Sequence, residues 1–185
     1  MKLHRLTYMN GAALAVVLCA LLAATSCSPS TPPDTSKADG GATKLFGGAQ
    51  VQEVFRLRLD RDDLIIESLL DAIKQHNIQD GAVLSVVGSV QECTYHGVKS
   101  LAQTAEQQFV TVKGPTEILS ANGIIAAGEP HLHITLSNFE KGAFGGHLEK
   151  GCRVLYRAEL TIAKFSGVPL ARKLNREGTP LLQRK

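Results

Sequence analysis

Three histidines stand close together in the segment 129–152, and their spacing is suited to binding chemistry. Apolar and polar residues alternate in its first half, which places His131 and His133 on the polar face of a predicted strand. A polar loop with a glycine follows, and the chain is then predicted to return as the second strand of a hairpin. If this hairpin is symmetric about Glu140, His147 lies directly opposite His133.

Three neutral imidazoles suit a divalent transition metal such as zinc, which binds histidine nitrogen at about 2.0–2.1 Å and keeps a fourth position for water or a ligand. We therefore predict a metal or small-ligand site at His131, His133 and His147. Gly145 and Gly146 carry no side chain, so they would let a ligand approach the returning strand closely. A solvated polar face of the sheet is the alternative interpretation of these histidines.

The same residues resemble the plant and prokaryote conserved domain, the PPC family. The resemblance runs from about Phe55 to Phe165 and rests on Pro130-His131-x-His133, on Gly145-Gly146-His147-Leu148, and on Gly151-Cys152 before a strand with Glu159. It implies a stand-alone bacterial copy that forms a homotrimer and holds a metal on these histidines. Plant members join the domain to AT-hook motifs and bind DNA, so DNA binding is the alternative function.

Glu129, Glu149 and Glu159 are the candidate proton carriers if the metal serves a hydrolytic or lyase reaction. Each carboxylate has a simpler role on the protein surface, and the same site without turnover would define a ligand-binding or assembly module. His-x-His also begins the first metal motif of the cupin barrel. That motif expects glutamate four or five residues after the second histidine, whereas Glu140 lies seven residues after His133.

The N-terminus has the order of a secretory signal, with basic residues, an apolar run over 11–24 and small residues before Cys27. We predict a signal peptide at 1–26 and lipidation of Cys27, with ordinary signal-peptidase cleavage as the alternative. Ser28 in place of aspartate resembles lipoproteins sorted to the outer membrane, so we expect an exported, membrane-anchored envelope protein facing the periplasm. Residues 27–50 are rich in Ser, Thr, Pro and Gly and predict a flexible linker.

Residues 51–165 are predicted to form one α/β domain of the α+β type, with a mostly antiparallel sheet of about seven strands. The main helix follows the first strand, is capped by the carboxylates of 60–63, and runs to about Asn77. Three short strands are predicted between 109 and 127, with a tight hairpin turn at Asn122-Gly123.

The charge pattern weighs against DNA. Residues 27–163 carry 12 Lys and Arg against 16 Asp and Glu, and the chain has no Gly-Arg-Pro core of an AT-hook. The basic surplus lies near the C-terminus, where 166–185 is predicted as a polar tail. Cys93 and Cys152 lack a motif spacing, so a disulfide and two buried thiols are both open.

Overall fold

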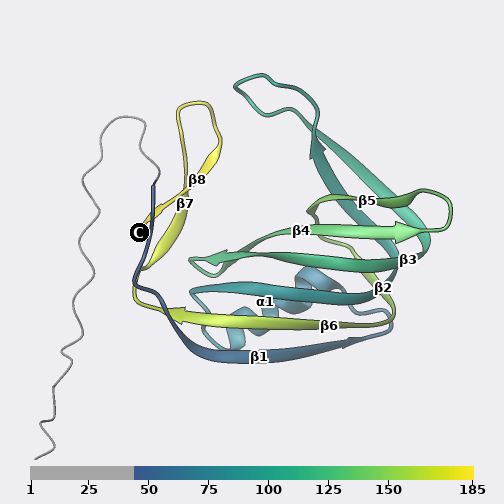
Figure 1. Cartoon of the computed structure of the whole chain (residues 1–185), viewed down its shortest axis with the longest axis horizontal. Helices are drawn as coiled ribbons and strands as arrows, with labels where there is room; N and C mark the ends of the chain where they lie inside the picture. Colours follow the sequence, from purple (N-terminus) through teal and green to yellow (C-terminus); the bar gives the residue numbers. More distant parts are fainter. Residues whose placement is uncertain (1–43) are drawn as a thin grey trace, which may run out of the picture. The chain divides into compact units, whose positions relative to one another are not determined.

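The computed structural model describes residues 44–185, which form one helix and eight strands (Figure 1). In chain order the elements are β1 (Gln50–Asp60), α1 (Ile65–Gln75), β2 (Asp80–Val98), β3 (Gln107–Ala126), β4 (Glu129–Asn138), β5 (Gly142–Leu148), β6 (Arg153–Ser166), β7 (Leu170–Leu174) and β8 (Pro180–Arg184). Within this described part, no helix has the length and apolar character that a membrane crossing needs. The predicted signal peptide, Cys27 and most of the predicted linker lie outside the described residues.

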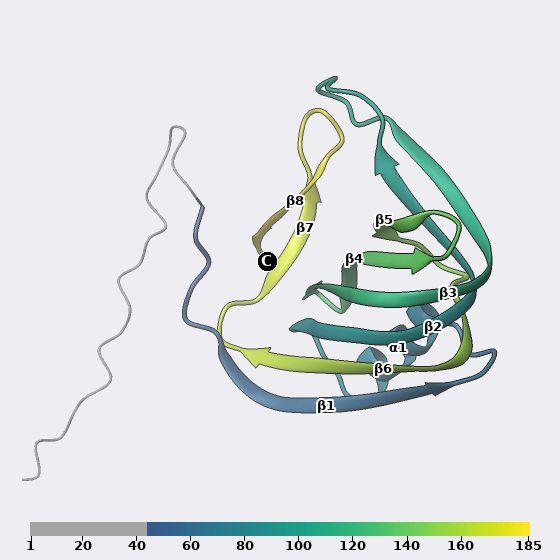
Figure 2. The same cartoon turned by 45° about the vertical axis from the view of Figure 1, so that its right-hand side comes forward.

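Six strands form one sheet in the order β1-β6-β2-β3-β4-β5, and every pair in it is antiparallel (Figures 1 and 2). β5 also pairs with the far end of β2, where Tyr95 lies opposite Leu148 and His96 opposite His147. The four strands β2 to β5 therefore close into a ring. The predicted class, a mostly antiparallel sheet with one helix after the first strand, is confirmed.

The core lies between α1 and one face of the sheet. α1 buries one apolar side, and alternate residues of β2, β4 and β6 face it. The buried residues that meet here are Ile65, Ile66, Leu69 and Ile73 of α1, Val83 and Val86 of β2, Leu132, Ile134 and Leu136 of β4, and Leu160 and Ile162 of β6. Because side chains alternate along a strand, this packing turns the histidines of β4 to the opposite face.

β3 is one long strand, so the prediction of three short strands was wrong. Asn122 and Gly123 lie inside β3, where they pair with His133 and Leu132 of β4. The chain instead reverses after β3 at 127–128, where both residues have positive φ, 53° and 79°. Pairing with β2 on one side and β4 on the other outweighs the local turn tendency of Asn-Gly.

The start of α1 also differs from the prediction. Its N-cap is Leu64, which has no side-chain capping bond, and the helix ends at Gln75. The Asp63 carboxylate instead accepts a hydrogen bond of 2.8 Å from the backbone N–H of Asp60. Asp63, one of the predicted capping carboxylates, thus stabilises the turn between β1 and α1.

The C-terminal segment forms the hairpin β7–β8, although 166–185 was predicted as a polar tail. Its turn is held by the Asn175 side chain, which accepts backbone N–H bonds from Glu177 at 3.1 Å and Thr179 at 2.7 Å. Local turn chemistry of this kind makes a hairpin out of a segment whose composition suggests a solvated terminus.

Cys93 and Cys152 form a disulfide, which settles the alternative left open by their spacing. The bond joins β2 to the segment just before β6, and both cysteines are fully buried. It therefore ties the end of β2 to the residues that follow β5.

Candidate metal centre

The β4–β5 hairpin has the predicted register. Its pairs run from Asn138 opposite Gly142 to His133 opposite His147, so the hairpin is symmetric about Glu140. The Asn138 side chain accepts backbone N–H bonds from Glu140 at 3.2 Å and Lys141 at 2.9 Å, which stabilises the loop. This local turn brings the third histidine to the first two.

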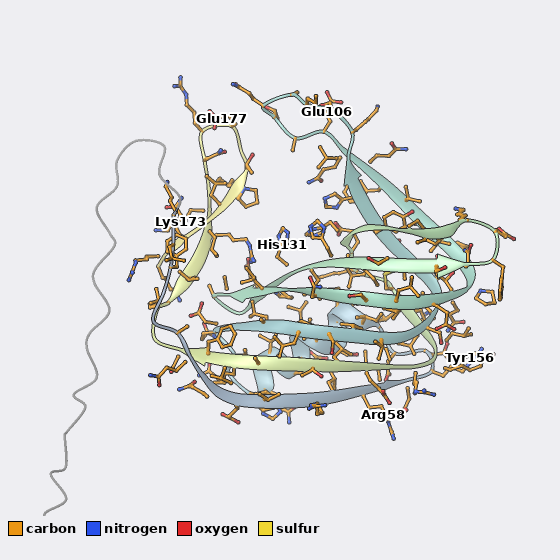
Figure 3. The ribbon with its side chains drawn as sticks, viewed as in Figure 1. Arg58, Glu106, His131, Tyr156, Lys173 and Glu177 are labelled. Atoms are coloured by element: carbon orange, nitrogen blue, oxygen red, sulfur yellow. A yellow bond between two sulfur atoms is a disulfide. The ribbon has the colours of Figure 1, made fainter. Side chains whose placement is uncertain are left out.

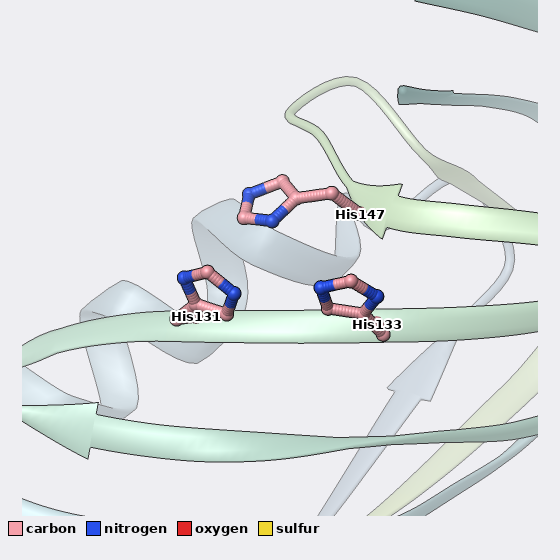
Figure 4. Close-up of side chains that lie close together, drawn as sticks. All are labelled: His131, His133 and His147. Carbon is pink, nitrogen blue, oxygen red and sulfur yellow. The ribbon is translucent and has the colours of Figure 1, made fainter. Parts of the chain in front are cut away.

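The three predicted histidines converge on one patch (Figure 4). The ring centroid of His147 lies 4.6 Å from that of His131 and 5.5 Å from that of His133, and the latter two are 5.4 Å apart. One ring nitrogen from each residue lies within 4.8 Å of the others. Nitrogens on one tetrahedral zinc are about 3.4 Å apart, so small side-chain rotations suffice to bind a common ion.

Burial favours the neutral form of two of these imidazoles, His131 and His147. Burial together with the nearby His131 and His96 lowers the pKa of His147 to about 4, while Glu149 opposes them. Burial also lowers the pKa of His131, with a second contribution from the charge of Arg172. A metal binds only the neutral imidazole, so the donor set fits a divalent transition metal at neutral pH.

His96 of β2 also contacts the site, and it was not among the residues predicted from the sequence. Its ring stacks on that of His147 with centroids 4.5 Å apart, and its Nδ1 lies 2.6 Å from the Glu149 carboxylate. An ionised carboxylate only accepts, so Nδ1–H of His96 donates. His96 meets His147 because β2 pairs with β5, a long-range contact that no local pattern in the sequence reveals.

The three predicted carboxylates lie in different places. Glu149 is at the cluster, because its Oε1 is also 3.9 Å from Nε2 of His147. Glu129 is exposed at the start of β4, two residues before His131, and marks the rim of the site. Glu159 is exposed on β6 with Arg157 3.6 Å away, and β2 and β3 separate its strand from β4. Only Glu149 is positioned to act on the histidines.

Both predicted glycines are required by the close pairing of the strands. A Cβ on Gly145 would lie 1.9 Å from the backbone oxygen of Ile134, and one on Gly146 would lie 2.3 Å from that of His96. Real Cβ atoms do not come this close to a backbone oxygen. The glycines therefore allow β5 to sit between β4 and β2, and they close the ring that carries His147.

Arg172 of β7 is a second residue that the sequence analysis missed, because it belongs to the segment predicted as a tail. Its guanidinium donates to the backbone oxygens of Glu129 at 3.1 Å and Ile124 at 3.2 Å. Figure 3 shows the His131 side chain on the side of the sheet that faces the β7–β8 hairpin. The hairpin is thus fixed beside the histidines.

An antiparallel sheet with one helix on its core face and a histidine cluster on the other defines a class of small α+β domains. The sequence pattern of the Plants and Prokaryotes Conserved (PCC) domain matches residues 47–166. This match covers more than half of the chain, so the protein belongs to the PCC-domain family, which is the PPC family of the predicted resemblance.

The chain is also similar to proteins from other organisms. The bifunctional protein GlmU of Synechococcus sp. (strain JA-3-3Ab) is 31% identical over 110 residues, which are 60% of this chain but only 17% of GlmU. A metal-containing protein from Archaeoglobus fulgidus has a TM-score of 0.64 at 22% identity, over 76% of this chain and 99% of its own. A protein from Bacteroides thetaiotaomicron, whose name gives DNA binding as a provisional role, has a TM-score of 0.62 at 19% identity. This match covers 72% of this chain and 94% of that protein. At these identities the two structures show a shared fold.

Proposed function

We propose that this chain is a metal-binding PCC-domain protein of the bacterial cell envelope, with one divalent transition metal on His131, His133 and His147. Zinc is the first candidate, because three neutral histidines with an open fourth position suit it. The observation that carries the proposal is the convergence of three ring nitrogens within 4.8 Å. The metal-containing relative from Archaeoglobus fulgidus adds support.

The surrounding residues have supporting roles in this proposal. Glu149 orients His96, and His96 stacks on His147, so the pair fixes the ring that comes from β5. When bound, the metal would supply Lewis acidity and lower the pKa of a coordinated water. A hydrolytic or lyase activity is therefore the catalytic form of the proposal, and retention of a ligand without turnover is its non-catalytic form.

Elemental analysis tests the metal site. The full chain, purified without a histidine tag or added metal, should contain about one metal ion per chain. His133→Ala and His147→Ala should retain little metal, because each removes one of three ligands. The matched control is His76→Ala, which removes a histidine at the end of α1 and should leave the metal content unchanged. A parent protein that stays metal-free after zinc is added would contradict the proposal.

We also propose that the protein is exported and anchored through lipid on Cys27. The Cys93–Cys152 disulfide supports export, because disulfides persist in oxidising compartments and are rare in the cytosol. The mass of the mature N-terminal peptide is the decisive measurement. A diacylated Cys27 agrees with the anchor, whereas cleavage without lipid would leave a secreted protein.

Self-association as a homotrimer is the third part of the proposal. The sheet face opposite α1 exposes five large apolar side chains, and each is 46–53% exposed. In its strand, each lies next to a residue that packs in or against the core. These five residues are Val54, Leu84, Val87, Leu119 and Ile124. A patch of this kind on one sheet face suits an interface between copies. Light scattering should give three times the chain mass, and a monomer at micromolar concentration would exclude the trimer.

DNA binding is the weaker candidate. Its support is the provisional name of the Bacteroides thetaiotaomicron protein. On the surface of β1 and β6, however, arginines already lie beside acids: Arg58 is 3.1 Å from Asp60, and Arg157 is 3.6 Å from Glu159. Phosphate contacts need basic groups that are free to replace counterions. Retention of a DNA duplex at physiological salt would revive this function.

A further inference from the structure

A pocket of about 420 Å³ lies between the histidines and the C-terminal hairpin. His131 and His133 of β4 and Arg172 of β7 are among the residues that line it. Ile124, Pro180 and Leu182 supply an apolar wall. The volume is in the range of sites for small organic molecules. The hairpin lies beyond residues 47–166, the part of the chain that the PCC family pattern matches.

The Arg172 guanidinium is a fixed cation in this pocket. Two of its nitrogens donate to the backbone oxygens of Glu129 and Ile124, which leaves three of its five N–H groups for another acceptor. Among residues 44–185, no carboxylate oxygen comes within the 4.0 Å of an ion pair with Arg172. A partly buried guanidinium with free donors favours a carboxylate as its partner.

We propose that this pocket binds a short-chain aliphatic carboxylate, with the carboxylate on Arg172 and the hydrocarbon chain against the Pro180 and Leu182 wall. The pocket also contains His131 of the proposed metal site, but the partner of the carboxylate is Arg172, so this inference goes beyond the proposed function. Phosphate would use the guanidinium but not the apolar wall, and a neutral alcohol would use only the wall. The two halves of the pocket together select an amphipathic acid.

Calorimetric titration of hexanoate into the full-chain protein tests this inference, with inorganic phosphate and hexanol as the comparison ligands. Hexanoate should bind more tightly than either. Arg172→Gln should weaken hexanoate binding by at least about 10-fold, because it removes a charged hydrogen-bonding partner. Arg184→Gln removes the same charge at an exposed position of the same hairpin and should change the affinity less than about 2-fold.

Arg172→Gln also breaks two bonds to the backbone, so a second variant leaves them intact. Asn122→Asp places a negative charge of nearly the same shape in the pocket and should weaken hexanoate binding while hexanol binding stays unchanged. Unchanged hexanoate affinity in both variants would overturn the inference, as would phosphate binding more tightly than hexanoate.

Metal content of the same samples separates this inference from the proposed function. Metal-loaded protein that does not bind hexanoate overturns the carboxylate pocket and leaves the metal site standing. Metal-free protein that binds hexanoate through Arg172 supports the pocket and counts against the metal site.

Discussion

Replacing Cys93 and Cys152 together by alanine is expected to lower the free energy of unfolding by about 4 kcal/mol. The disulfide closes a loop with a sequence separation of 59, and the restriction that it places on the unfolded chain scales with the logarithm of that length. Both positions are fully buried, so alanine adds no polar group to the core. Urea unfolding of the oxidised parent and the double variant measures the difference.

The same variant tests what the disulfide does for the site. The N–H of Glu149 donates to the backbone oxygen of Thr94 at 3.0 Å, beside Cys93, so the disulfide supports the segment that carries Glu149. Under conditions where the variant remains folded, its metal content should stay near that of the parent, because the β4–β5 register places His133 and His147. Equal urea midpoints for parent and variant would show that the disulfide does not stabilise the fold.

Acidification of the metal-free protein should lower its stability through His147. The folded state holds the pKa of this imidazole at about 4, against 6.5 for an unperturbed histidine. Between these pH values the unfolded chain binds more protons, so the free energy of unfolding falls as the pH falls from 6.5 to 4. The full shift corresponds to about 3 kcal/mol, and the loss from this group should be smaller because solvent screens the partly exposed ring. Above pH 6.5 the imidazole is neutral in the folded and the unfolded state, so it does not make the free energy of unfolding depend on pH.

Unfolding by urea at several pH values, in the presence of a chelator, checks this expectation. His147→Asn should make the dependence between pH 6.5 and 4 less steep, with His131 keeping part of it, whereas His76→Asn should leave the slope unchanged. An equally steep dependence in His147→Asn would assign the effect to other groups. Without the chelator and with metal bound, the free energy of unfolding of the parent should fall more steeply with falling pH, because protons compete with the ion for the same nitrogens.

Local patterns in the sequence determined much of the site. Alternation along β4 put His131 and His133 on one face, and the hairpin around Glu140 placed His147 opposite His133. Both depend on neighbours within a few residues, through the period of two in a strand and the geometry of one turn. The helix after the first strand was predictable for the same reason, since its apolar spacing is local.

Only the tertiary structure decided which residues surround those histidines. His96 reaches His147 because β5 returns to β2, and Arg172 reaches the pocket because the C-terminal hairpin docks beside β4. His96 and His147 are 51 positions apart along the chain, and Arg172 and Glu129 are 43 positions apart. They form because two glycines let strands approach closely and because backbone oxygens at the end of β3 and the start of β4 accept from Arg172. Such pairings depend on how the whole sheet closes, so no local period in the sequence encodes them.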